Sequence, residues 1–529
     1  MAISVPTRQR PGAMGREKAK LRKVLGRFDL VFFTASAIVG LDTDAFAASV
    51  GGQAVLWLGI SLVLFLIPYG MLVAELGSTF PVEGGPYAWT RMALGRLPGS
   101  IAAVLYWLSN PIWVGGTLAA TTIATLNAFV FKKPLGTAAE ILVGLAFVWV
   151  CVGLAIVALR IGKWGPNIGT IVKILAVGIF TALFIAFLVQ HGRPAGTVHA
   201  GDVKPTVTGF LGVVGVLIFL WVGFELSSGA GEEMRNPRRD VPVMVLQSGV
   251  IGAVLYGLVI LGIMLVIPKA ALSNVSGFAD AYNRVAGVLG GASRGFGYFF
   301  AAVIILTLVG SGSVWLEGAD RAQAIAALDG AAPKWMGRFT SFGTPIAVNI
   351  MSGLIGSAFV FFVFLITKGS LANFFAVMIA LVISLATLCY FFMFPALIVL
   401  RRKYPDRPRP YTVPGGMVGA WIAVVLCEIF VVLAGVTLLW PGLIDRILGH
   451  SYSIQDNFGV SRVFFEAVTL GTFGAIIVLA VVFWLIGRHD IRSGALTDTD
   501  LLDKPLDETR ADEEAQPVSG STEVPERAA

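Results

Sequence analysis

Apolar residues recur along this chain in runs of about twenty or more, each long enough to cross about 30 Å of hydrocarbon as a helix. Short polar segments rich in Lys, Arg, Gly and Pro separate these runs. We therefore predict an all-α integral membrane protein with twelve transmembrane helices. The predicted spans are residues 29–50, 55–79, 99–127, 138–159, 167–189, 208–230, 242–267, 295–318, 344–366, 372–398, 414–440 and 463–487.

The composition agrees with this pattern and excludes several classes of protein. The chain has 529 residues, of which 56% are hydrophobic and 13% charged, far more apolar than a soluble globular protein. Its three cysteines lie inside apolar runs without metal-ligand spacing, and no glycine loop followed by Lys and Ser or Thr is present. We expect neither an enzyme nor an ATP-driven pump, and no cofactor, metal or nucleic-acid partner.

Charge is distributed unevenly along the chain. Residues 1–27 contain eight Lys or Arg, whereas residues 490–529 contain eleven acidic residues and four basic ones. Lys and Arg are concentrated in the loops on the N-terminal side of the membrane, which predicts that both termini are cytoplasmic. We divide the chain into a basic cytoplasmic segment, a transport core, the last two spans and an acidic disordered tail. These parts are residues 1–27, 28–398, 399–487 and 488–529.

Two predicted spans are interrupted by polar residues near their middle. The first carries Asp42 and Asp44 beside Gly40, and the sixth carries Glu225 close to Gly223. A carboxylate at this depth is costly unless it faces protein, water or substrate. The two spans are five apart, so the matched interruptions predict broken helices 1 and 6 of a five-plus-five inverted repeat (LeuT-like). The last two helices are then appended, and the substrate binds near the midplane.

An unwound helix offers backbone groups to a ligand, because its freed N–H and C=O groups need partners. N–H groups at the start of a half-helix suit a carboxylate, and freed carbonyls suit an ammonium. Two such breaks together suit the two ends of an amino acid.

Four side chains within the spans each admit two roles. Asp42 suits either an N-cap of the second half-helix or direct contact with substrate or proton. Glu225 suits a proton carrier or gate, or a neutral acid bonded to the unwound backbone. Lys173 suits a snorkelling lysine or a buried amine in place of a coupling cation. Trp315 suits a lid over the pocket or ordinary packing.

Three blocks of sequence carry a family resemblance. They are residues 74–89 (AELGSTFPVEGGPYAW), the pair of segments 223–225 (GFE) and 236–242 (NPRRDVP), and the corner at residues 329–330 followed by Pro333 and residues 343–345. These blocks resemble the amino acid–polyamine–organocation (APC) permeases over roughly residues 28–440.

The resemblance implies that the broken first and sixth helices hold the substrate. Phe219 matches the aromatic gate of the family, and Lys173 resembles the lysine that replaces a sodium ion in some proton-coupled members. It implies a coupling role for Lys173, driven by protons or by exchange, and the expected burial of Glu225 makes that residue the second coupling candidate. The implied substrate-binding residues are Ile38, Gly40, Leu41, Asp42, Thr43, Phe219, Trp221, Val222, Gly223, Phe224, Glu225 and Trp315.

The first break departs from the small-residue pattern of many family members, because it reads Leu41-Asp42-Thr43 after Gly40. In this it resembles the glutamate/γ-aminobutyrate (GABA) exchanger branch, and it suits a diamine equally well.

We predict a secondary active transporter of amino acids or derivatives such as GABA in a bacterial inner membrane. It works by alternating access, proton-coupled or by exchange, as a monomer or homodimer. A polyamine or diamine transporter is the alternative, and a transporter-like nutrient sensor is a third hypothesis.

Overall fold

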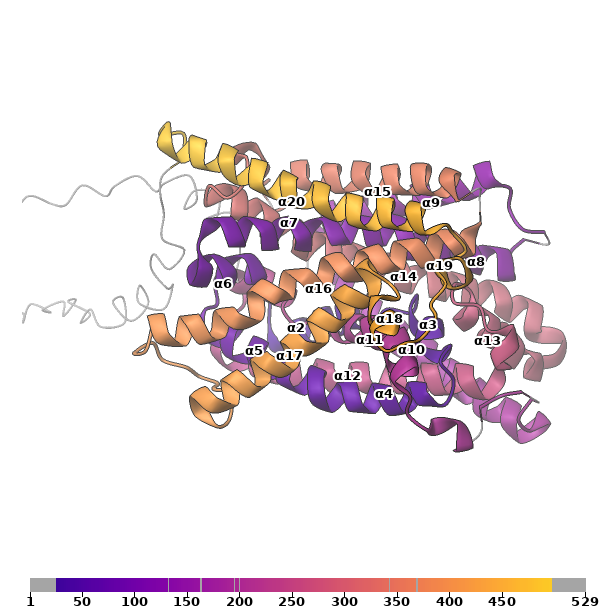
Figure 1. The fold of residues 1–529 in the computed structure, drawn as a ribbon. Helices are drawn as coiled ribbons and strands as arrows, with labels where there is room; N and C mark the ends of the chain where they lie inside the picture. Colours follow the sequence, from indigo (N-terminus) through magenta and orange to yellow (C-terminus); the bar gives the residue numbers. More distant parts are fainter. Residues whose placement is uncertain are drawn as a thin grey trace, which may run out of the picture.

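The structure is a computed structural model that describes residues 25–496 apart from 132, 162–163, 195, 199, 342 and 368–369. Most of the predicted basic segment and most of the acidic tail therefore lie outside the described residues. Long helices run side by side along one common direction (Figure 1). Within the described part, extended pairing is limited to an isolated bridge between Leu25 and Met234.

The first predicted repeat, with the loop after it, is built from short and long helical pieces. They are α2 (Arg27–Ile38), α3 (Asp44–Ala48), α4 (Gln53–Ser61), η1 (Leu62–Leu66), α5 (Ile67–Thr79), α6 (Gly85–Leu94), α7 (Arg96–Trp113), η2 (Val114–Leu118), α8 (Ala119–Phe129), α9 (Thr137–Ile161), α10 (Trp164–His191) and η3 (Ala200–Val203).

The second predicted repeat and the last spans follow in the same manner. Their elements are α11 (Val207–Trp221), η4 (Ser227–Glu233), α12 (Pro237–Val266), η5 (Lys269–Ala271), α13 (Gly277–Ala286), η6 (Gly287–Ala292), α14 (Ser293–Leu328), η7 (Lys334–Gly337), α15 (Ile346–Ile366), α16 (Leu371–Lys403), α17 (Gly416–Leu439), α18 (Leu443–Ile447), α19 (Ile454–Phe458) and α20 (Arg462–Arg492).

The helices confirm the predicted class of integral membrane protein. In the described part of the chain, nine helical segments are long and apolar enough to cross a membrane, and Val207–Trp221 and Ile346–Phe362 are shorter apolar helices. The number of twelve spans and the inverted repeat stay predictions. The first predicted span consists of two pieces, α2 and α3, and the sixth of α11 and η4.

The broken helices lie inside the bundle. α2 packs against α12, α10 and α14, and η4 contacts α14 and α6. In contrast, α20 runs along one edge of the molecule (Figure 1). Its apolar side chains Val463 and Val478 are 79% and 63% exposed, which suits contact with lipid. Burial of the broken helices shields the unwound backbone from hydrocarbon.

Candidate substrate site at two helix breaks

The two breaks lie against one another in the centre of the protein. Helix α2 ends at Ile38 and α3 begins at Asp44, whereas α11 ends at Trp221 and η4 begins at Ser227. Gly223 has φ +134°, a conformation that side chains rarely adopt. A Cβ atom there would also lie 3.1 Å from Ile38 and 3.3 Å from Trp315. Only glycine allows this close approach.

Side chains from three other helices cap the end of α2. The carbonyl oxygen of Ser36 accepts a hydrogen bond from Lys173 of α10. The next carbonyl, that of Ala37, accepts one from Trp315 Nε1 of α14 at 2.8 Å. The carbonyl of Ile38 accepts one from the Tyr256 hydroxyl of α12. Three consecutive helix-end carbonyls thus find partners inside the protein.

Tyrosines also occupy backbone N–H groups at both breaks. The Tyr256 hydroxyl accepts a bond from Gly40 N at 2.8 Å. The Tyr69 hydroxyl accepts bonds from Gly223 N and Phe224 N, both at 3.0 Å. These are the kind of groups that the sequence analysis assigned to a substrate carboxylate, and three of them are already paired. The unwound backbone is stabilised by tyrosine from α5 and α12.

A small cavity of about 10 Å³ lies between the breaks. This volume holds about one water molecule, so a substrate of several atoms enters only when side chains move. Trp113 forms edge contacts with Phe219 and Trp315, with ring centroids 5.9 and 6.1 Å apart. The lining residues are Ala37, Ile38, Gly40, Asp42, Thr43, Trp113, Phe219, Val222, Tyr256 and Trp315.

Seven of the predicted substrate-binding residues line this cavity, namely Ile38, Gly40, Asp42, Thr43, Phe219, Val222 and Trp315. Five others do not. Trp221 donates a hydrogen bond to Ser61 Oγ, Phe224 lies between α5 and α12, and Leu41 and Gly223 are buried beside the cavity. Glu225 is the fifth.

Asp42 and Asp44 are buried carboxylates with unpaired oxygens. Asp42 Oδ2 accepts hydrogen bonds from Trp113 Nε1 at 2.9 Å and Thr117 Oγ1 at 2.7 Å. In the part of the chain that the structure describes, Asp42 Oδ1 and both oxygens of Asp44 have no hydrogen-bond partner. Both residues are at most 2% exposed, and their carboxylates lie close enough to interact electrostatically. These three carboxylate oxygens at the first break are therefore available as acceptors, which suits the binding of a cation.

Lys173 is buried and bonded within the protein. It is 1% exposed and donates to Ser311 Oγ at 2.6 Å as well as to the Ser36 carbonyl. This placement is incompatible with a snorkelling side chain, which would reach the membrane surface. The ammonium joins α2, α10 and α14 next to the first break.

Glu225 is surrounded by tyrosines and does not reach the cavity. Its Oε1 accepts hydrogen bonds from Tyr390 at 2.8 Å and Tyr106 at 3.1 Å. Its Oε2 accepts a bond from Tyr69. The carboxyl group is fully buried, and its three partners come from α5, α7 and α16. It fixes the second break to three other helices.

A second group of charges lies at the end of α14 near α6. Arg321 bonds Glu233 of η4 through both terminal nitrogens, at 2.9 and 3.0 Å, and lies 3.5 Å from Glu83. Glu83 also accepts a bond from Glu232 N. Burial raises the pKa of Glu83 to about 8, although the charge of Arg321 opposes the shift. These contacts fix the far half of the second broken helix.

Several residues of the site were missed by the sequence reasoning, namely Ala37, Trp113, Thr117, Tyr69 and Tyr256. Tyrosine in a membrane span is usually found at an interface. Tyr69 and Tyr256 lie well inside their spans instead, and this depth was the available signal. Asp44 was noticed as part of the interruption but was not assigned a role.

The fold and site define a helical multi-pass membrane transporter. A family model described as amino acid permease matches residues 25–447. The chain therefore belongs to the amino acid permease family of the APC superfamily, as the resemblance predicted.

Named relatives span most of the chain. An uncharacterized transporter of Legionella pneumophila is 30% identical over 407 residues, 75% of this chain and 85% of the relative. The probable agmatine/putrescine antiporter AguD of Lactococcus lactis is 28% identical over 429 residues, 79% of this chain and 88% of AguD. The branched-chain amino acid permease BcaP of Bacillus subtilis is 26% identical over 465 residues, 81% of this chain and 92% of BcaP.

Solved structures share the fold. A manganese transporter of Eremococcus coleocola, in complex with an aromatic bis-isothiourea compound, superposes with a TM-score of 0.53 at 13% identity. The match covers 91% of this chain and 97% of that one. At this identity the likeness concerns the fold alone.

Proposed function

We propose that this chain is a secondary transporter whose substrate carries a positively charged amine, and that the amine binds at Asp42 and Asp44. The observation that carries the proposal is the imbalance at the first break. Among the described residues, three buried carboxylate oxygens there have no hydrogen-bond partner, whereas Gly40 N is already bonded to Tyr256. A buried carboxylate needs a cation or hydrogen-bond donors, and a substrate ammonium supplies both.

This proposal favours a diamine over a zwitterionic amino acid as the substrate. Gly223 N and Phe224 N are bonded to Tyr69, so these two groups do not receive a substrate carboxylate. Lys173 is engaged by Ser36 and Ser311. The relative AguD, named a probable agmatine/putrescine antiporter, supports the same substrate class.

An amino acid or GABA is the second candidate substrate. The relative BcaP, named a branched-chain amino acid permease, favours it. In either case we propose coupling by exchange or by protons, with Lys173 in place of a metal cation beside the first break. We also propose a cell-membrane location with both termini in the cytoplasm, in line with the charge distribution.

Counterflow in liposomes separates the two candidates. Purified full-length protein is reconstituted, the liposomes are loaded with unlabelled putrescine or leucine, and entry of labelled agmatine, putrescine, GABA, glutamate and leucine is measured. We expect exchange among the amines. Exchange limited to GABA, glutamate or leucine would replace the amine proposal with the second candidate. Folded protein that moves none of them would favour the sensor hypothesis.

A further inference from the structure

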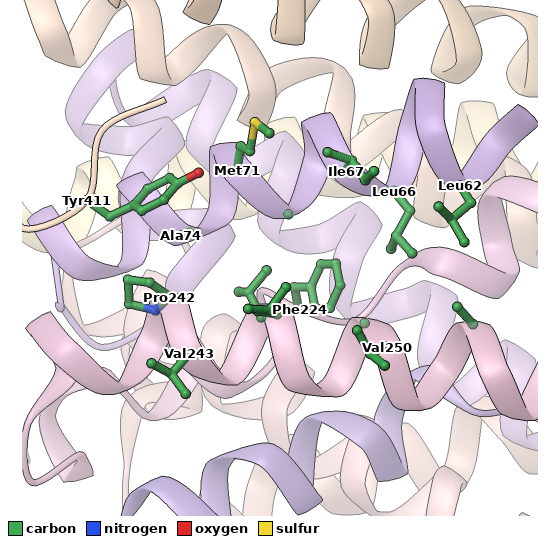
Figure 2. A pocket seen from close by; sticks show the side chains of 15 residues that line it. Leu62, Leu66, Ile67, Met71, Ala74, Phe224, Pro242, Val243, Val250 and Tyr411 are labelled. Carbon is green, nitrogen blue, oxygen red and sulfur yellow. The ribbon is translucent and has the colours of Figure 1, made fainter. Parts of the chain in front are cut away.

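A lateral groove of about 550 Å³ separates α5 from α12. Figure 2 shows Tyr411 and Pro242 at one end, Leu62 and Val250 at the other, and Phe224 between the two helices. Apart from the Tyr411 hydroxyl, the side chains that line the groove carry no oxygen or nitrogen. The groove shares no lining residue with the cavity between the breaks. It is therefore a separate apolar site.

The groove is open towards lipid and has the length of one leaflet. Ile67, Leu246 and Val250 on its walls are 43%, 68% and 57% exposed. Along η1 and α5 it extends from Leu62 to Ala74, about 18 Å at a rise of about 1.5 Å per residue. Half of a hydrocarbon core is about 15 Å thick. One acyl chain of one leaflet matches this length.

The end of the groove at Pro242 adjoins a basic surface. Arg238 and Arg239 precede Pro242 by one helical turn, so they lie on the same side of α12, and both are exposed. The neighbouring Asp240 accepts a hydrogen bond from Arg27 Nε at 2.9 Å. Basic residues at a membrane interface attract anionic headgroups. The charge thus selects an anionic phospholipid.

Phe224 connects the groove to the second break. A Cβ atom on Gly70 or Gly249 would lie 3.4 or 3.1 Å from its ring, so glycines on both walls make room for it. Its backbone N–H donates to Tyr69, which in turn donates to Glu225. A chain in the groove would contact the unwound segment directly.

We propose that the α5–α12 groove binds one acyl chain of an anionic phospholipid, with the phosphate beside Arg238 and Arg239. The bound chain packs on Phe224 and stabilises the second break in its present arrangement. The transport rate consequently depends on the lipid that occupies the groove. This site is distinct from the substrate site and does not depend on which substrate is carried.

Photolabelling tests whether the groove is occupied. The full-length protein is reconstituted with phosphatidylglycerol that carries a photoreactive group on one acyl chain, and labelled peptides are identified by mass spectrometry. We expect label on Ile67, Met71 and Leu246. Val250→Trp should fill the groove and abolish this label, whereas Val254→Trp, on an exposed position outside the groove, should retain it. Equal labelling of both variants would overturn the proposal.

The headgroup is tested with the same photoreactive chain on phosphatidylcholine. Removing one arginine near the surface costs about 1 kcal/mol of lipid affinity, or about fivefold. We therefore expect Arg239→Gln to reduce phosphatidylglycerol labelling about fivefold. Arg294→Gln, at an exposed position in the first turn of α14, should leave this labelling unchanged. Equal labelling by both lipids would overturn the anionic assignment.

Transport measurements test the effect of the bound chain. Because the bound chain stabilises one arrangement of the break, wild type should exchange substrate more slowly in phosphatidylglycerol than in phosphatidylcholine liposomes, and Val250→Trp should lose this difference. Equal or faster exchange by the wild type in phosphatidylglycerol would overturn the regulatory part of the proposal. A lipid dependence that persists in Val250→Trp would overturn the regulatory part of the proposal. Labelling requires no substrate, so its result stands even if the proposed substrate is wrong.

Discussion

The two helix breaks carry buried carboxylates at matching places, yet their surroundings differ. One oxygen of Asp42 accepts hydrogen bonds from Trp113 and Thr117, and its other oxygen, in a residue that lines the cavity, has no partner among the residues that the structure describes. Glu225 receives bonds from three tyrosines on its two oxygens and lies away from the cavity. The comparison indicates that a polar residue at a break can serve either a ligand or the fold, and that its unpaired atoms distinguish the two.

The unwound backbone is stabilised in the same way at both breaks. Tyr256 at the first break and Tyr69 at the second each bond the unwound N–H groups from a neighbouring helix. Because these N–H groups are bonded to tyrosines of the protein, we expect selectivity to depend mainly on side chains. The difference between Asp42 and Glu225 is therefore the part of the site that experiments should examine first.

Replacing Asp42 should have the largest effect on transport. Asp42→Asn retains the size of the side chain but removes the charge that we propose faces the substrate amine. A hydrogen bond to a charged group is worth about 1.5–3 kcal/mol, so we expect about 10- to 100-fold lower kcat/KM for amine exchange. Initial rates of counterflow measure this loss. Asp406→Asn, at an exposed loop position, is the matched control and should behave as wild type.

Replacing Glu225 should affect stability more than substrate recognition. In Glu225→Gln, the amide NH₂ would face at least one tyrosine hydroxyl that now donates to the carboxylate. An unmade buried hydrogen bond costs about 1–3 kcal/mol of unfolding free energy. We expect a lower thermal midpoint in detergent and a smaller change in KM than Asp42→Asn causes. An unchanged midpoint with a raised KM would show that Glu225 contacts substrate, contrary to the comparison.

The breaks themselves were predictable, whereas their partners were not. A glycine and a carboxylate inside an apolar span are rare and costly, so Gly40, Asp42 and Glu225 identified both interruptions. Tyr69 pairs with Glu225 across 156 residues, and nothing local to either position indicates that contact. Whether a carboxylate is paired depends on such distant neighbours. The coupling role of Glu225 was therefore predicted without knowledge of the three tyrosines that donate hydrogen bonds to it.

Replacing Lys173 tests whether its ammonium group acts in place of a coupling cation beside the first break. Lys173→Met removes the donor to the Ser36 carbonyl and the positive charge near Asp42. We expect exchange to slow about tenfold, since a charged hydrogen bond of about 1.5 kcal/mol is lost. Rates with and without a pH gradient, and with added sodium, measure the effect. Sodium-dependent exchange by the wild type would contradict the proposed role of Lys173.

The smallest expected effect on transport concerns the far half of the second broken helix, where a carboxyl group outside the spans titrates and changes stability. Burial raises the pKa of Glu83 from 4.5 to about 8, against the opposing charge of Arg321. The folded protein therefore binds this proton more tightly than the unfolded chain does, and stability falls as pH rises from about 4.5 to about 8.

Glu83→Gln should remove this part of the pH dependence. Thermal midpoints at pH 5, 6, 7 and 8 should decline less in the variant than in wild type. The underlying difference in unfolding free energy is on the order of 1 kcal/mol for each unit of raised pKa. Glu466→Gln, which breaks only an exposed pair with Arg462, should keep the wild-type slope. A parallel decline in all three proteins would mean that Glu83 does not titrate in this range, and that the charges around η4 act as fixed contacts.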